Sequence, residues 1–227
     1  MTEENSSSKK FDPAGRYLLL DASGPLVQTA LWQSGKWLRW TGSREEAGKS
    51  LFSGTREILK SEKTGFEDLN GFLFCEGPGS MLGIRIAAMA IRGWQSTVDF
   101  HLPVFSYQSL FLLAKILLKQ ETKPPFHLIS DARRKRWNLV SVLPGGKIAP
   151  LSRLTAGELE KLQGPFFRME ESFIRSEPPK PAKIISYNLK NHASLFLDKD
   201  LPAYSETAEP FLGEEPQYQK WQKRRHR

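Results

Sequence analysis

The feature that most constrains the fold is residues 71–94, in which an apolar run leads through a Gly-Pro-Gly turn into an Ala-rich segment. The run at 71–75 shows no polar alternation, which is typical of a buried, parallel strand. The glycines and proline at 77–79 break this strand, and Ser80 is a suitable N-cap for a following helix. The sequence therefore predicts a strand, a tight turn and a helix in direct succession.

The helix predicted after this turn has more apolar surface than a single sheet requires. At about 100° per residue, its apolar side chains cover an arc of roughly 200°, about twice the stripe of a helix that packs on one body. Gly83, Ala87 and Ala90 lie in the middle of the arc, where another backbone could approach closely. Two interpretations stay open: a wholly internal helix, or one that also contacts a second body.

The glycine turn also raises the question of phosphate binding, because free N–H groups at helix N-termini bind anions. Gly77, Gly79 and Gly83 have the spacing G-x-G-x-x-x-G, one residue longer than the dinucleotide fingerprint, and no Gly-Lys-Ser/Thr follows. Pro78 also lacks an N–H donor. As a bare glycine loop, the turn is therefore a weak signal for a nucleotide.

Composition and charge narrow the class of protein. The 227 residues are 39% hydrophobic, enough for one large domain or two lobes. The single cysteine, Cys75, lies in the predicted buried strand, which excludes a disulfide framework and indicates a reducing compartment. The polar N-terminus has no signal-peptide pattern, and the longest apolar run, 110–118, is too short to span a bilayer. We therefore expect a soluble, cytoplasmic protein without a membrane partner.

The net charge of +8 raises the question of an anionic partner. Five positive charges fall in the last eight residues, and four more fall at 133–136. Each run is either a solvated tail or turn, or a contact to RNA, and the sequence leaves both open.

An internal repeat predicts two similar lobes. The segments LLLDA at 18–22 and LISDA at 128–132 are offset by 110 residues, and a tight turn, a strand, a Gly-containing turn and another strand follow each. In the second unit, 147–151 is the expected third strand. A capped helix should follow each unit, with Ser43 and Glu46 in capping-box spacing in the first. A repeat at half the chain length suggests a duplicated β-β-β-α unit.

These patterns divide the chain into four parts: a disordered tail at 1–15, an N-terminal lobe at 16–108, a C-terminal lobe at 109–215 and a basic tail at 216–227. The first tail is polar and Ser-rich, which favours disorder. The proline-containing segment after 197 is expected to be mostly irregular.

The longer pattern Gly-Pro-Gly-Ser-x-x-Gly-Ile-Arg-Ile at 77–86, between a strand and an Ala-rich helix, closely resembles the signature of the TsaB (YeaZ) family. Asp-Ala-Ser at 21–23 resembles the Asp-Thr-Ser/Ala that ends the family's first strand. Asp-Ala-Arg at 131–133 resembles the motif that opens its second lobe, and 216–221 loosely resembles its C-terminal Pro-x-Tyr-x-Arg. The resemblance is best over 16–110.

The chain departs from the family pattern at three positions. Met81 and Leu82 stand where Phe-Thr is usual, and Lys49 stands where a His often precedes the serine of the helix after the first meander. These positions put partner binding in question.

The resemblance implies a fold and a role. The family belongs to the actin/Hsp70/sugar-kinase superfamily, which implies an α/β fold of two similar RNase H-like lobes with mixed sheets and flanking helices. It also implies a non-catalytic subunit that supports a TsaD-like transferase in making threonylcarbamoyladenosine in tRNA. Further implied partners are a TsaE-like ATPase, tRNA indirectly, and a second copy of the chain when it is alone.

The family's partner contact is implied to lie on the first helix and the signature helix. The corresponding residues here are Ala47, Leu51, Ile58, Leu82, Gly83, Ile86, Ala87, Ala90 and Trp94.

In catalytic members of the superfamily, strand-end aspartates beside Gly/Ser/Thr turns hold the phosphates of a Mg²⁺-nucleotide. The alternative is that Asp21 and Asp131 cap turns through their own side chains, and Pro25 stands where the first hairpin should offer a free N–H. We expect no tightly bound cofactor, with Mg-ATP as the only candidate. The candidate nucleotide residues are Asp21, Ser23, Gly77, Gly79, Ser80 and Asp131.

No catalytic or metal-binding residue is assigned. The four histidines are scattered and form no H-x-x-x-H or H-E-x-x-H pair, and no G-x-S-x-G elbow surrounds Ser80. Two alternatives stay open: an independent ATPase or small-molecule kinase of the same superfamily, and an RNA-binding module that acts through its basic tail.

Overall fold

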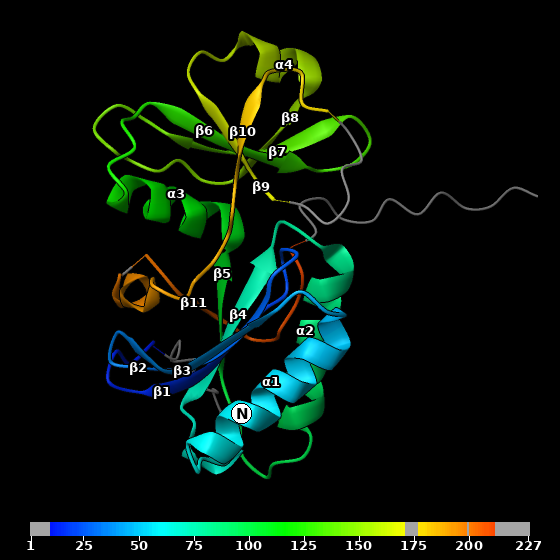
Figure 1. Cartoon of the computed structure of the whole chain (residues 1–227), viewed down its shortest axis with the longest axis vertical. Coiled ribbons are helices and arrows are strands. Elements are labelled where there is room, and N and C mark those ends of the chain that lie inside the picture. Colours follow the sequence, from blue (N-terminus) through cyan, green and yellow to red (C-terminus); the bar gives the residue numbers. More distant parts are fainter. Residues whose placement is uncertain (1–9, 171–176, 199, 212–227) are drawn as a thin grey trace, which may run out of the picture.

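Two β-sheets, one above the other along the long axis, form the framework of the molecule (Figure 1). The computed structural model describes residues 10–170, 177–198 and 200–211. Basic residues 216–227, predicted to form a tail, and the family-like segment at 216–221 lie outside this range.

The first sheet has the strand order β11-β5-β4-β1-β2-β3. Strands β1, β2 and β3 form an antiparallel meander, whereas β4 and β5 are added in parallel on the other side of β1. The strands are β1 (Arg16–Asp21), β2 (Val27–Gln33), β3 (Lys36–Ser43), β4 (Gly71–Gly77), β5 (Val104–Gln108) and β11 (Ala203–Ser205).

The second sheet, of order β10-β9-β6-β7-β8, repeats this topology. Its meander is β6-β7-β8, and β9 and β10 are added in parallel beside β6. The duplication and the predicted α/β class with mixed sheets are therefore confirmed. The strands are β6 (Phe126–Asp131), β7 (Arg136–Val142), β8 (Ser152–Thr155), β9 (Phe166–Met169) and β10 (Ala182–Ile185).

The helices fill three positions around the sheets (Figure 1). Helices α1 and α2 lie side by side against the first sheet, α3 lies between the two sheets, and α4 packs on the second sheet. The α-helices are α1 (Ala47–Ser61), α2 (Met81–Gln95), α3 (Ser109–Lys119) and α4 (Ala156–Lys161), and short 3-10 helices span Phe66–Asp68 and Ala193–Leu197.

Helix α3 joins the two halves through one hydrophobic cluster. Its sequence SLFLLAKILLK is apolar nearly all round, which is the pattern of an internal helix. The cluster it belongs to includes Leu19 and Phe105 of the first sheet and Leu128 and Val140 of the second. Each buried leucine of α3 contributes about 1.5–3 kcal/mol relative to an exposed one.

Two predicted local features differ from the structure. The third strand of the second meander is 152–155, whereas the predicted stretch 147–151 makes only an isolated bridge at Ile148, because Pro150 has no N–H to donate to a ladder. The predicted capping box also does not form. Ser43 is the last residue of β3, and Glu46, the N-cap of α1, makes no side-chain cap.

Residues 10–15, predicted to belong to a disordered tail, contact the core instead. The ring of Phe11 lies 4.5 Å from that of Tyr17 and 5.3 Å from that of Trp32, measured between centroids. Aromatic pairs at such separations add to the area that they bury, so this part of the prediction was wrong. Residues 1–9 lie outside the described ranges.

The end of the described chain returns from the second sheet to the first. The Trp32 and Trp37 indoles donate to the carbonyls of Ala193 and Leu189, both at 2.8 Å, and β11 then pairs with β5. The segment predicted to be mostly irregular thus contains a strand. Division of the chain between 108 and 109 stays a prediction, because α3 contacts both sheets.

Within the residues just described, no helix combines the length and the apolar character needed to cross a membrane.

We predict that Gln28→Leu weakens the attachment of the returning segment. The buried Gln28 amide accepts the Leu189 N–H at 2.6 Å, and an apolar side chain would leave that buried donor unpaired. The free energy of unfolding should fall by about 1–3 kcal/mol in urea titrations. Gln33→Leu, at the partly exposed end of the same strand, is the matched control. Equal stability of the two variants would contradict the prediction.

Candidate functional site

Asp21, the last residue of β1, is fully buried, and its carboxyl group accepts four hydrogen bonds. The backbone N–H and the hydroxyl of Ser23 donate to Oδ1 at 2.9 and 2.7 Å. The hydroxyls of Tyr107 and Tyr187 donate to Oδ2 at 2.7 and 2.8 Å. A carboxylate offers about four lone-pair sites, so its own chain satisfies this one completely.

The two tyrosines reach Asp21 from different parts of the fold. Tyr107 lies on β5, and Tyr187 lies just after β10, in the segment that returns from the second sheet. Burial raises the pKa of both phenols well above the usual value, and the negative charge of Asp21 raises each pKa further. Both hydroxyls therefore keep the proton that they donate. Nothing in the sequence indicated either tyrosine.

Cys75 lies on β4 beside this cluster and is buried. Burial is the main cause that raises the pKa of its thiol, and the Asp21 charge adds to the rise. A thiol in such surroundings stays protonated and unreactive, which gives Cys75 a packing role.

The signature turn docks on the backbone that follows Asp21. The Ser80 N–H donates to the Ser23 carbonyl at 2.7 Å. A Cβ atom at Gly79 would lie 2.1 Å from the Ser23 carbonyl oxygen, and one at Gly83 would lie 2.2 Å from the Ala22 carbonyl oxygen. Side chains cannot fit at such distances, so both glycines are required for α2 to approach β1.

Further hydrogen bonds within the chain hold this turn. As predicted, Ser80 is the N-cap of α2, and its hydroxyl accepts the Gly83 N–H at 3.3 Å. The Ser109 hydroxyl, at the start of α3, donates to the Pro78 carbonyl at 2.5 Å. The turn therefore fixes α2 and α3 against the ends of the strands.

The residues singled out as nucleotide ligands fall into two groups. Asp21, Ser23, Gly79 and Ser80 come together at the turn just described, and Gly77 ends β4 beside them. Asp131 ends β6 in the second sheet, where its Oδ1 accepts the Arg133 N–H at 2.6 Å. Both aspartates thus accept the N–H two residues further on, which is the turn-capping geometry named as the alternative.

The predicted partner residues also divide into two groups. Leu51, Ile58, Gly83, Ala87 and Ala90 are buried, and the first two and Ala87 belong to the cluster that α1 and α2 form with the first sheet. Partly or largely exposed are Ala47, Ile86, Trp94 and Leu82, of which Leu82 is 71% exposed.

Two further apolar side chains on these helices are exposed, although sequence analysis did not single them out for the interface. Met89 on α2 is 70% exposed and Phe52 on α1 is 48% exposed. The Phe52 ring packs edge-on against that of Trp94, 5.5 Å between centroids. We call Phe52, Leu82, Ile86, Met89 and Trp94 the outer face of α1 and α2.

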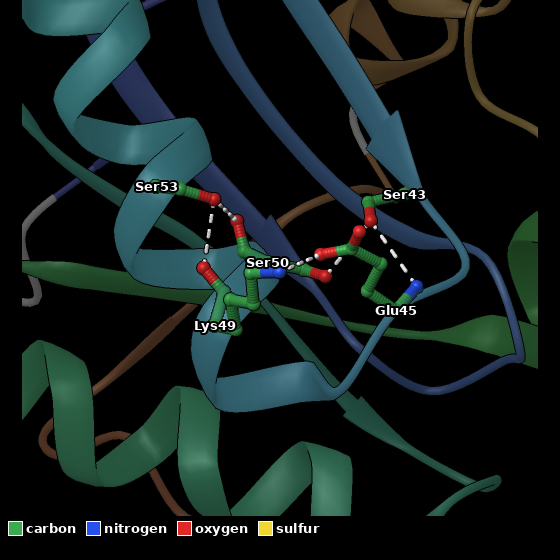
Figure 2. A network of polar contacts seen from close by, with 5 residues as sticks. All are labelled: Ser43, Glu45, Lys49, Ser50 and Ser53. Carbon is green, nitrogen blue, oxygen red and sulfur yellow. Dashed lines mark hydrogen bonds and ion pairs between the residues drawn. The ribbon is translucent and has the colours of Figure 1, made fainter.

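A polar network joins the end of β3 to the start of α1 (Figure 2). Ser43 accepts the Glu45 N–H at 3.2 Å and lies 3.0 Å from the hydroxyl of the buried Ser50. Lys49, which departs from the family pattern, forms an exposed ion pair with Glu45 at 2.8 Å. The Ser53 hydroxyl donates to the Lys49 carbonyl at 2.7 Å. Lys49 and its partner Glu45 thus form an ion pair one helical turn before Phe52 of the outer face.

Among the described residues, no group of three or more His, Cys, Asp or Glu side chains is arranged to hold a metal ion.

Comparisons of this chain with known proteins find similarity to proteins named for threonylcarbamoyl modification of tRNA. A family model described as TsaD, tRNA N6-adenosine threonylcarbamoyltransferase, matches residues 47–149. The tRNA threonylcarbamoyladenosine biosynthesis protein TsaB of Buchnera aphidicola subsp. Acyrthosiphon pisum (strain APS) is 28% identical over 81 residues. That alignment spans 36% of this chain and 36% of the relative.

Two solved structures share the fold over most of the chain. YeaZ from Pseudomonas aeruginosa aligns with a TM-score of 0.62 and 19% identity, covering 87% of this chain and 99% of its own. A Pseudomonas aeruginosa protein described as similar to peptidase YeaZ aligns with a TM-score of 0.61 and 19% identity, covering 87% and 98%. The chain has the fold of these proteins, and the findings together support the TsaB (YeaZ) family that the signature resembles.

We predict that Asp21→Ala destabilises the fold, because it leaves two buried phenol hydroxyls and the Ser23 N–H unpaired. At about 1–3 kcal/mol for each unsatisfied group, the free energy of unfolding should fall by about 3 kcal/mol or more. Asp131→Ala, at the equivalent position of the other sheet, is the internal control and should cost less, because Asp131 is only partly buried. Chemical denaturation of both variants is the measurement, and a smaller loss for Asp21→Ala would contradict the prediction.

Proposed function

We propose that this protein is a TsaB-like subunit that binds and stabilises a TsaD-like threonylcarbamoyltransferase acting on tRNA. The observation that carries the proposal is the outer face of α1 and α2, an apolar surface exposed on a chain with the YeaZ fold. The Buchnera relative named for this biosynthesis supports the pathway. We further propose a cytoplasmic location and indirect contact with tRNA.

The outer face has the character of a docking surface. Singly exposed apolar side chains are common, but a contiguous group marks an interaction site. Leu82, Ile86 and Met89 follow each other at helical spacing along α2, and Phe52 with Trp94 continues the surface onto α1. Burying two side chains such as Leu82 and Met89 in a partner would contribute about 1.5–3 kcal/mol each.

The occupant that we propose is a matching pair of helices on a TsaD-like subunit. A second copy of the chain would use the same face when that subunit is absent, which gives a homodimer. A TsaE-like ATPase would join the assembly elsewhere. Lys49 lies beside the face and is held by Glu45, so we expect its departure from the family pattern to change the charge of the contact rather than abolish it.

We also propose that the subunit is not itself catalytic. The strand-end aspartate that would hold a Mg²⁺-nucleotide has all four acceptor positions taken by Ser23, Tyr107 and Tyr187. Neither the turn after this aspartate nor the signature turn contains a basic residue, and Pro78 in the signature turn has no N–H to donate. These features argue against the alternative of an independent ATPase or small-molecule kinase.

The isolated protein should therefore bind Mg-ATP weakly and hydrolyse it no faster than buffer. Isothermal titration with Mg-ATP and a phosphate-release assay are the measurements. Submicromolar binding of Mg-ATP, or hydrolysis above the buffer rate, would contradict the proposal and favour the kinase interpretation.

Leu82→Glu should abolish partner binding without harming the fold. A carboxylate buried and unpaired in the contact costs several kcal/mol, which corresponds to about a thousandfold loss of affinity. Ile184→Glu, on β10 and 53% exposed, is the matched control and should bind normally. Sedimentation with and without the TsaD-like subunit reports association, and thermal melts report the fold.

Ala90→Glu tests the buried face of α2, whereas Leu82→Glu tests its exposed face. Because Ala90 is buried within the chain's own fold, the Ala90→Glu variant should lose stability, whereas Leu82→Glu should not. Normal association of a well-folded Leu82→Glu variant would contradict docking through the outer face.

A further inference from the structure

The turn between β6 and β7 carries three consecutive residues with left-handed backbone. Arg133, Arg134 and Lys135 have φ values of 65°, 50° and 60°. This region costs residues other than glycine roughly 1–2 kcal/mol each, and Asn and Asp are the other residues that enter it readily. Long cationic side chains thus occupy positions for which the backbone alone would select Gly or Asn.

The turn is held in one conformation. The Arg133 N–H donates to Asp131 Oδ1 at 2.6 Å, the Ala132 N–H to the Arg136 carbonyl at 3.0 Å, and the Arg136 N–H to the Arg133 carbonyl at 3.0 Å. The side chains of residues 133–135 are exposed, and within the described part of the chain no ion pair is formed by them. The turn therefore presents three cationic side chains to solvent from a fixed backbone.

The internal repeat shows that the topology does not require this turn. The equivalent connection in the first sheet, residues 22–26 between β1 and β2, reads Ala-Ser-Gly-Pro-Leu and has no charge. It also has no residue in the left-handed region. The first sheet thus makes the same strand-to-strand connection without left-handed residues and without cations.

We propose that the β6–β7 turn is a contact for the phosphate backbone of tRNA. The inference rests on the proposed role in tRNA modification and goes beyond the indirect contact proposed above, because it names a surface that touches the RNA directly. Lys and Arg side chains in a fixed array neutralise neighbouring phosphates and position a nucleic acid without reading its bases. An overall charge of +8 favours the same polyanion.

The test replaces the three cations in a way that suits the backbone. In the full-length chain, Arg133→Asn, Arg134→Asn and Lys135→Asn together remove three charges and keep residues that tolerate the left-handed region. The matched control, Lys36→Gln with Lys123→Gln and Lys147→Gln, removes three charges from other exposed positions. The basic C-terminal residues are present in all three proteins.

Fluorescence anisotropy with a labelled tRNA transcript, over a series of KCl concentrations, is the measurement. The Asn variant should bind about tenfold more weakly. The slope of log affinity against log salt should fall by about 2, because three phosphate contacts are lost. The control should bind like the parent, and the Asn variant should melt no lower than the parent.

Three results would overturn the inference: unchanged tRNA affinity in the Asn variant, an equal loss in the control, or binding of the parent to phosphatidylglycerol vesicles without affinity for tRNA. Sedimentation with the TsaD-like subunit keeps this test separate from the proposed function. The Asn variant should still associate, because the turn lies on the second sheet and the outer face lies on α1 and α2.

Discussion

The hydrogen bonding of the Asp21 carboxyl group is the interaction on which the rest of the structure depends. It joins the end of β1 to Tyr107 on β5 and to Tyr187, which is 166 positions away in the chain. A buried carboxyl with any of these donors missing would bear a desolvation penalty that nothing offsets. The returning segment must therefore hold its place over the first sheet, and the Trp32 and Trp37 indoles fix it there.

Two lobes of the same topology thus use equivalent aspartates differently. Asp21 is sealed by side chains and by the signature turn, whose glycines admit the Ala22 and Ser23 carbonyls. Asp131 caps an open, cationic turn. The glycine pattern that resembles a phosphate cradle is here a packing device, because α2 can reach the strand ends only without side chains at 79 and 83.

Sequence alone gave the duplication, most strands, the Ser80 cap and the family resemblance, since these depend on local pattern and on turn residues. It missed β11, because a three-residue strand has no periodicity and depends on the exposed edge of β5. It also misplaced the cap of α1, because Ser43 extends the β3 pairing with Val27 instead. Tyr107 and Tyr187 had no signal, since their role exists only when distant segments meet.

The apolar arc of α2 is wider than one packed face requires, and helical periodicity alone does not show which part of the arc packs against the fold. A helical wheel finds that the arc exceeds one face, but it cannot say which edge meets the sheet. Packing decides this by size. Gly83 faces the Ala22 carbonyl, which leaves no room for a side chain, and Ala87 and Ala90 are buried as well. The larger Leu82 and Met89 remain outside, where each offers more apolar area to another molecule than an alanine would. A close fit to the chain's own sheet and a bulky outer face are therefore two consequences of one helix sequence.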